Sequence, residues 1–306
     1  MLAGPIVRAS EFLPQLQSPR TLSWDRAFEG TRQFIFGLCK KAFIADHLAF
    51  YVDPVFASGG AYDGLATWIA VLGYAAQIYC DFSGYSDMAT GAARTLGFDF
   101  NENFRHPYIA TSIDSFWRRW HISLSSWLRD YLYIPLGGNR HGEWKTYRNL
   151  PLTMLLGGLW HGAAWTFVIW GGLHGSLLAL ERARGKTALY HRLPRPFRVG
   201  ATFAMVSIGW VFFRAADLGD AIRYLGVMFG LVAVPPAGTL LGGVLYQPYF
   251  LGAVLAAAVV TWSCPQTWDW TRRLTPPRAG LTAAGLLLAL ALLSTQAYNP
   301  FIYFIF

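Results

Sequence analysis

Residues 149–180 read NLPLTMLLGGLWHGAAWTFVIWGGLHGSLLAL, a run of 32 residues without an acidic or basic side chain. As a single α-helix the run would be about 48 Å long, whereas the hydrocarbon core of a bilayer is about 30 Å thick. It is too long for one crossing and too short for two full ones. The glycines at 157, 158 and 162 predict a break into two unequal pieces. That break places His161 at the end of a half-length segment, near the middle of the bilayer.

The composition of the whole chain indicates a membrane protein. Hydrophobic residues make up 54% of its 306 residues, aromatic residues 16% and charged residues 14%. Soluble domains carry about 25% charged residues. Apolar runs recur along the whole length, so we expect one all-α domain over residues 1–306. We interpret it as a polytopic transmembrane helical bundle with short, broken and interfacial helices. The first 20 residues lack the pattern of a signal peptide.

Run lengths give the remaining elements. Besides the run at 150–180, we predict spans at 64–82, 198–214, 244–263 and 280–300. Short or interfacial helices are expected at 31–47, 115–133 and 219–232. The uncharged run from 224 to 268 exceeds one crossing, and Pro235, Pro236 and Gly238 are the predicted break.

The net charge of +8 is explained by membrane topology better than by a nucleic-acid partner. Basic residues gather between apolar runs, at 129–148, 181–198 and 271–278. If these clusters are cytoplasmic, the span at 198–214 leaves the cytoplasm, the span at 244–263 returns, and the last span ends outside. The three cysteines show no spacing typical of a metal or redox site and are interpreted as small hydrophobic residues.

Two histidines are unusual for their surroundings. An imidazole at membrane depth costs free energy, so His161 is expected to be a hydrogen-bonded core residue, to line a wet cavity or to do chemistry. His121 lies in DSFWRRWHISLSSWLRDYLYIPLGGNR (114–140), an amphipathic, aromatic-rich segment typical of an interface. By spacing alone His121 could be a base, a ligand or a capped core residue. His174, in GGLHG, carries a weaker signal.

Several long motifs carry a resemblance to a known family. They are QIYCDFSGYSDMATGAARTLGFDFNENFRHPYIATSIDSFWRRWHISLSSWLRDYLYIPLGGNR (77–140), RNLPLTMLLGGLWHGAAWTFVIWGGLHG (148–175), IGWVFFRA (208–215) and the terminal FIYFIF. Together they resemble the bacterial branch of the membrane-bound O-acyltransferase family, from GPIVR at Gly4 to the C-terminus. Members of that family carry further membrane helices ahead of the GPIVR segment. The chain is therefore expected to correspond to about the C-terminal two thirds of the family's fold.

The resemblance implies an activity and a location. It implies transfer of an acetyl or other acyl group from a cytoplasmic donor, acetyl-CoA being the expected one, to a hydroxyl of an exopolysaccharide such as alginate. It also implies a multi-pass protein of the bacterial inner membrane, acting directly or through a periplasmic acetyltransferase or relay protein beside polysaccharide-secretion proteins. Other acceptors remain open, namely cellulose, peptidoglycan and a serine of a relay protein. Transfer of D-alanine to teichoic acid, the reaction of a related branch of the family, also remains open.

The resemblance also assigns residues. The histidine of the family's WHG motif is the proposed catalytic residue and falls on His161, and the histidine of the RRWH motif falls on His121. Attack by an alcohol needs a group that takes its proton, and a neutral imidazole can do so because burial keeps its pKa low. We expect His161 to be this base and His121 to orient a substrate or stabilise charge. Arg118 and Arg119 could attract a phosphorylated donor, although both could instead be interfacial residues.

Other classes are less well supported by the sequence. Asp81, Asp87, Asp99 and Asp114 could orient an imidazole, but loop and cap roles are expected for them. The chain carries no motif typical of serine hydrolases, zinc proteases or P-loop enzymes, so neither a metal nor a bound cofactor is expected. The alternatives from other classes are a transporter or channel, against which the lack of an internal repeat counts, and a non-catalytic membrane scaffold.

Overall fold

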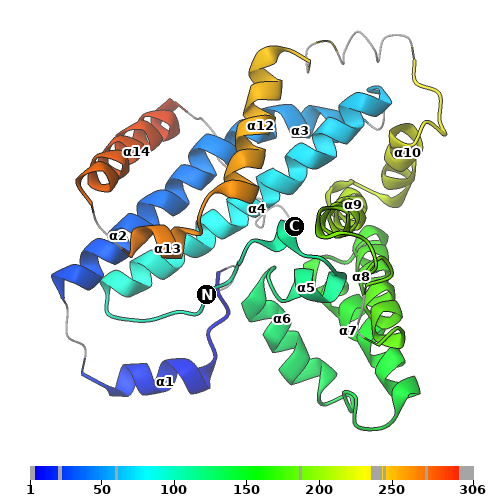
Figure 1. Cartoon of the computed structure of the whole chain (residues 1–306), viewed down its shortest axis with the longest axis horizontal. Coiled ribbons are helices and arrows are strands. Elements are labelled where there is room, and N and C mark those ends of the chain that lie inside the picture. Colours follow the sequence, from blue (N-terminus) through cyan, green and yellow to red (C-terminus); the bar gives the residue numbers. More distant parts are fainter. Residues whose placement is uncertain are drawn as a thin grey trace.

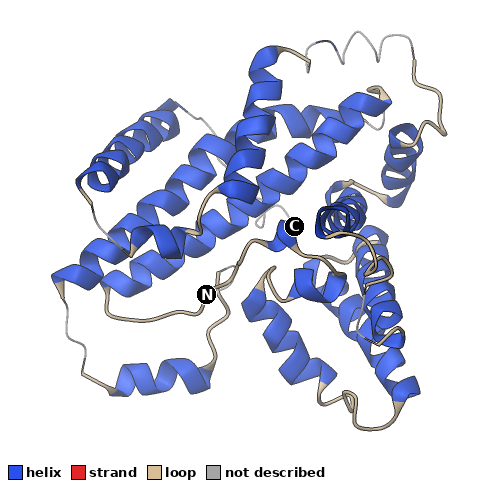
Figure 2. Ribbon diagram, viewed as in Figure 1, coloured by secondary structure: helices blue, strands red, loops and turns tan. Residues whose placement is uncertain are grey.

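The chain is all-helical in the computed structural model, which describes residues 4–19, 23–58, 61–185, 188–235, 243, 246–272 and 275–295 (Figures 1 and 2). No strand occurs among these residues. The α-helices are α1 (Ala9–Gln17), α2 (Trp24–Cys39), α3 (Asp46–Ala57), α4 (Gly64–Thr95), α5 (Ile113–Trp117), α6 (Ile122–Leu128), α7 (Glu143–His161), α8 (Trp165–Ala183), α9 (Arg195–Arg214), α10 (Leu218–Met228), α12 (Pro248–Ser263), α13 (Thr267–Thr271) and α14 (Pro276–Thr295). Short π-helical or 3₁₀ turns occupy Lys40–Ala45, Pro107–Ile109 and Arg129–Tyr133.

The three spans predicted after residue 190 are confirmed as helices. They correspond to α9, α12 and α14, of which α9 and α14 are long and apolar enough to cross a membrane, as is α4. The shorter α10 matches the predicted helix at 219–232. Residues 296–300 of the last predicted span, and Pro236 and Gly238 of the predicted break, lie outside the described residues. The direction in which each helix crosses stays a prediction.

The first predicted span is longer than expected. Helix α4 begins at Gly64, where the Asp63 carboxylate accepts a hydrogen bond of 2.8 Å from the Ala66 amide, and it continues for 32 residues instead of ending near 82. Loop or cap roles were wrong for Asp81 and Asp87, which are buried inside this helix. Asp99 does lie in a loop, after α4. The helix tolerates buried carboxylates because each has a cationic partner on a neighbouring element.

Those partners come from the segment predicted as a short helix at 31–47. It is instead helical without interruption from Trp24 to Ala57, through α2, the π-helical turn Lys40–Ala45 and α3, and it packs against α4 (Figure 1). Lys41 Nζ lies 2.7 Å from Asp81 and 2.6 Å from Asp46, and Lys40 forms an ion pair with Asp87. Side-chain pairing across the interface, which a periodicity count does not reveal, buries the face of this segment that packs on α4, while side chains such as Trp24 and Phe50 remain exposed.

Glycines bring α2 and α4 into backbone contact. A Cβ added to Gly30 would lie 2.5 Å from the Gly91 carbonyl oxygen, and one added to Gly84 would lie 2.7 Å from the Gly37 carbonyl oxygen. The two contacts are seven residues apart on each helix, which keeps both on one face of an α-helix. Close approach through small residues is a common way of packing membrane helices. We call α2, the π-helical turn, α3 and α4 the charged helix group.

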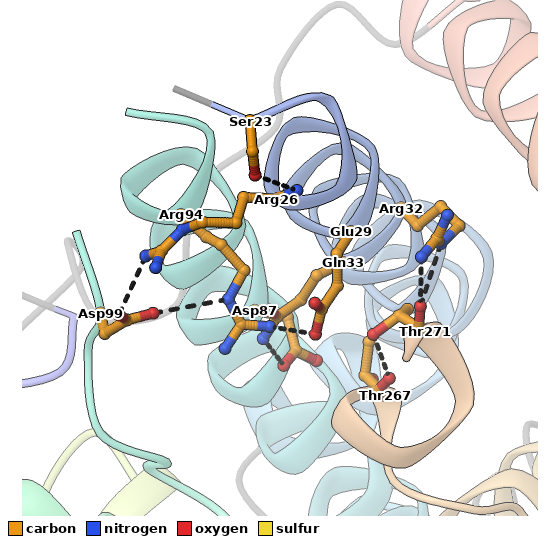
Figure 3. Close-up of polar contacts among 10 residues, drawn as sticks. All are labelled: Ser23, Arg26, Glu29, Arg32, Gln33, Asp87, Arg94, Asp99, Thr267 and Thr271. Carbon is orange, nitrogen blue, oxygen red and sulfur yellow. Dashed lines mark hydrogen bonds and ion pairs between the residues drawn. The ribbon is translucent and has the colours of Figure 1, made fainter. Parts of the chain in front are cut away.

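Polar contacts also hold the charged helix group together where α2 begins and α4 ends. Figure 3 shows Arg26 and Arg94 converging on Asp99, at 2.9 and 3.9 Å. It also shows the Arg32 guanidinium donating two hydrogen bonds, of 3.0 and 2.6 Å, to the Thr271 carbonyl at the end of α13. These bonds anchor the chain between α12 and α14 to α2.

The run at 149–180 forms a helical hairpin of equal arms. Helices α7 and α8 have 19 residues each, because α7 begins upstream at Glu143 and α8 ends at Ala183. The prediction of unequal pieces, with His161 on a half-length segment, was therefore wrong. A break was correctly expected: it falls at residues 162–164, directly after His161. The depth of His161 in a bilayer stays a prediction.

Only one of the three glycines acts at the break. Gly157 and Gly158 lie inside α7, and Gly158 contacts the Phe167 carbonyl of α8 too closely to accept a Cβ. Gly175 of α8 is similarly tight, since an added Cβ would lie 2.5 Å from the Pro151 Cα. At Gly162 a Cβ would lie 2.6 Å from Phe167 Cδ2, so the turn needs glycine for space. The glycines of this run mostly serve helix packing.

The segment predicted as one helix at 115–133 is broken. Helix α5 ends at Trp117, α6 begins at Ile122, and a π-helical turn follows at Arg129–Tyr133. The break has a physical cause in His121, which has φ of 43° and ψ of 56°. This left-handed conformation is uncommon for a residue with a side chain and cannot continue an α-helix. Helices α5 to α9, with the turns between them, are called the aromatic-histidine group below.

Candidate active site

His161 ends α7, and its half-buried ring sits among aromatic rings from three helices. The ring centroid lies 5.1 Å from Trp160, 5.3 Å from Trp170 of α8 and 5.3 Å from Phe213 of α9, in edge-to-face arrangements. Aromatic surroundings of this kind disfavour the charged imidazolium. They leave a neutral ring, which is the form that can take a proton.

His121 is held more tightly than His161. Only 3% of it is exposed, and its ring lies edge-on to Phe82 of α4 at 4.6 Å. Two backbone hydrogen bonds hold the turn on either side: the Arg105 amide donates to the Arg119 carbonyl and the Ile122 amide to the Asn103 carbonyl, both at 2.9 Å. The loop after α4 therefore fixes the strained backbone at His121.

Asn103 contacts the ring of His121 directly. Its Oδ1 lies 3.1 Å from His121 Nδ1 and accepts hydrogen bonds of 3.2 and 2.8 Å from the amide and hydroxyl of Ser123. At its other end Nδ2 donates to Ser86 Oγ of α4, at 3.0 Å. Asn103 is itself 2% exposed. This residue was missed in the sequence, because Asn103 and His121 are 18 positions apart and no single helix contains both.

The two histidines, 40 positions apart in the sequence, are brought into the same region. Burial, and secondly the positive charge that His161 would carry, hold the pKa of His121 well below its usual range. A chain of rings joins them: Trp120 next to His121 lies 4.9 Å from Trp210, Trp210 lies 6.2 Å from Trp170, and Trp170 lies 5.3 Å from His161. The two histidines are thus connected through packed aromatic side chains, while their roles stay a prediction.

Arg118 and Arg119 lie in the turn that leads to His121, but their guanidinium groups are engaged elsewhere. Arg118 is 75% exposed and pairs with Asp114 at 2.7 Å. Arg119 donates to the Arg105 carbonyl at 3.2 Å. Both could still meet a donor at the surface, so substrate binding by them stays a prediction.

Two other buried residues of α8 support the site. Both carboxylate oxygens of Glu181 accept hydrogen bonds from the start of α5, from the Ile113 amide at 2.8 Å and the Asp114 amide at 3.0 Å. His174 is fully buried, with ring contacts to Trp117 at 5.1 Å and Trp170 at 5.2 Å. Glu181 was counted at the sequence level only as part of a charged cluster.

A small polar pocket adjoins Asn103 on the side away from His121. Its interior space, about 10 Å³, is roughly enough for one water molecule, and the pocket is partly open to the surface. Its lining side chains are Lys40, Ser83, Ser86, Asp87, Thr90, Asn103, Phe104, Gln266 and Trp268. The part of the chain that the structure describes contains no cluster of His, Cys, Asp and Glu suited to a metal ion.

The helical architecture, with α4, α9 and α14 each long and apolar enough to cross a membrane, defines a multi-pass membrane protein. Residues 1–213 match the model of the membrane-bound O-acyltransferase (MBOAT) family. The chain belongs to this family. The matched region, residues 1–213, includes both His121 and His161.

Individual relatives come from three kinds of protein. The chain is 43% identical over 334 residues to the probable alginate O-acetylase AlgI of Pseudomonas putida, with 100% of this chain and 66% of that protein covered. It is 44% identical over 238 residues to the peptidoglycan O-acetyltransferase of Helicobacter pylori (76% and 45% covered). It is 30% identical over 190 residues to the teichoic acid D-alanyltransferase of Bacillus subtilis (58% and 47% covered). The chain spans about two thirds of the length of the AlgI protein that it matches throughout.

Proposed function

We propose that the protein is a membrane O-acyltransferase that moves an acetyl group from a cytoplasmic donor, acetyl-CoA, to a hydroxyl of an exopolysaccharide such as alginate. The observation that carries the proposal is the chain of packed aromatic rings that joins His121 to His161, in a chain that belongs to this family. The alginate acceptor is favoured because the likeness to the AlgI protein covers the whole chain. The inner membrane is the proposed location, with a periplasmic partner as a possible relay for the acetyl group.

The proposed chemistry uses the neutral ring of His161 as the base. His161 takes the proton of the acceptor hydroxyl as its oxygen attacks the thioester carbonyl, the bond between carbonyl carbon and sulfur breaks, and the proton passes to the leaving thiolate. His121 orients a substrate group beside this reaction.

Transfer of acetyl is preferred to transfer of D-alanine. The likeness to the two O-acetyl-transferring relatives is 43–44% identity over three quarters or more of the chain. The likeness to the D-alanyltransferase is 30% over 58% of it. Against a transporter counts the lack of an internal repeat in the sequence.

Replacing His161 by Ala tests the function. In a strain deleted for the gene, the H161A protein should reach the membrane in normal amounts while acetylation of the secreted polymer falls by about 10²–10⁴-fold, the usual contribution of a general base. H141A is the matched control, since His141 is exposed in the loop before α7. Unchanged acetylation by H161A would exclude the base and favour the scaffold or transporter.

A further inference from the structure

The hydrogen bonds around Asn103 determine which way its side-chain amide points. The backbone N–H of Ser123 can only donate, so the Asn103 atom 3.2 Å from it must be the oxygen. The Ser123 hydroxyl accepts a 3.0 Å hydrogen bond from the Ile6 amide and donates its own hydrogen to the same oxygen at 2.8 Å. The amide nitrogen then faces Ser86 Oγ, as its donor role requires. The orientation is thus imposed by groups outside the histidine.

The oxygen of Asn103 in turn determines the tautomer of His121. It lies 3.1 Å from His121 Nδ1. Two acceptors at that distance would repel each other, so Nδ1 must carry the hydrogen and donate it. Because burial disfavours the doubly protonated ring, Nε2 then keeps its lone pair. A ring of this kind accepts a hydrogen bond at Nε2 and does not donate one there.

We propose that Asn103 is the positioning residue of His121, fixing the Nδ1–H tautomer so that Nε2 accepts a hydrogen bond from a second hydroxyl of the acceptor sugar, beside the hydroxyl whose proton His161 takes. This inference rests on the proposed function for the identity of the hydroxyl, but not for the tautomer. It narrows the role of His121 from stabilising negative charge to orienting a hydroxyl group. The left-handed backbone at His121 and the two flanking backbone hydrogen bonds supply the rigidity that such positioning needs.

The direct test is ¹⁵N NMR of the full chain, labelled at histidine and held in lipid bilayers, with His121 assigned by its absence in H121N. The expected wild-type spectrum has a protonated, pyrrole-type Nδ1 and an unprotonated, pyridine-type Nε2 at neutral pH. The opposite pattern overturns the proposal. The measurement needs no acetyl transfer, so its failure is distinguishable from failure of the proposed function.

Variants separate positioning from a merely structural role. N103L is close in size but has no acceptor, so the tautomer should become mixed and kcat should fall by about 10- to 100-fold, as is usual when a partner that orients a histidine is lost. N103D keeps the acceptor and the tautomer. Its carboxylate favours the imidazolium, so the acid limb of its pH–activity profile should move to higher pH. N101L makes the same change at the exposed Asn101 and should alter neither tautomer nor kcat.

An unchanged kcat and tautomer in N103L would overturn the proposal, as would an N103D acid limb at the wild-type pH. If N103L does not fold, the wild-type spectrum and the N103D profile still decide the matter.

Discussion

The charged helix group and the aromatic-histidine group both contain helices in backbone contact through glycines, yet they treat polar side chains in opposite ways. Between the π-helical turn that follows α2 and the helix α4, the partly buried Lys40 and the buried Lys41 meet Asp87 and Asp81, so each charge is neutralised within the protein. Around α7 and α8, by contrast, the histidines lie among aromatic rings. Paired charges hold a scaffold together, whereas a neutral imidazole in an apolar setting is available for proton transfer.

The largest effect is expected from breaking a buried ion pair. In K41M, Asp81, which is fully buried, and Asp46 lose their cation, so the free energy of unfolding should fall by about 3–5 kcal/mol. The double variant K41M/D81L should recover a large part of that loss, because an apolar pair of similar volume needs no partner. Thermal unfolding in detergent micelles, followed by tryptophan fluorescence, measures both. A K41M protein as stable as wild type would show that the charges do not hold α4 in place.

Glycine packing should be equally sensitive in both groups. In G91A the new methyl group meets the Gly30 carbonyl of α2, and in G175A it meets Pro151 of α7, both at 2.5 Å. In each variant the free energy of unfolding, measured by the same thermal unfolding, should fall by about 1–3 kcal/mol. This loss is larger than the stability that alanine adds through its higher helix propensity. G172A is the matched control, because its nearest neighbour is Leu155 Cδ2 at 3.6 Å. Destabilisation of G172A comparable to that of G175A would contradict the contact argument.

Acidification should affect the aromatic-histidine group through His121. Its folded-state pKa lies well below the usual 6.5, so below pH 6.5 the unfolded chain binds a proton that the folded chain does not. Stability from this residue is therefore present above pH 6.5 and lost as the pH falls, with a limiting slope of about 1.4 kcal/mol per pH unit. Comparing thermal unfolding of wild type and H121N between pH 7 and pH 5 isolates the contribution. The free energy of unfolding should fall more steeply with decreasing pH in the wild type than in H121N. Equal slopes would show that His121 does not have a lowered pKa in the folded protein.

The smallest effect on stability is expected from R118A. The ion pair of Arg118 with Asp114 is exposed, and such pairs contribute about 0–1 kcal/mol. If Arg118 attracts the phosphates of acetyl-CoA, its loss should raise KM for the donor with kcat nearly unchanged. D114A is the control, since it removes the ion pair but keeps the guanidinium. A KM unchanged in R118A would assign the residue to the interface alone.

Much of the architecture was predictable because hydrophobic run length is a local property. The bilayer thickness sets the length of an apolar helix, so α9, α12 and α14 were anticipated within a few residues. Motif resemblance likewise picked out His121 and His161 before any geometry was known. Run length failed at the segment from Trp24 to Ala57 and at α4, where Lys41 and Asp81 look like breaks in apolar runs although their charges cancel in space.

The sequence by itself determined the membrane class, the family and the two histidines, since composition, run length and motifs require no knowledge of neighbours. Tertiary structure alone decided that α7 and α8 are equal arms, that glycines 158 and 175 serve packing, and that Asn103 meets His121. The physical reason is that burial, ion pairing and hydrogen bonding depend on residues far apart in the chain. Only the folded backbone sets which of them come within bonding distance.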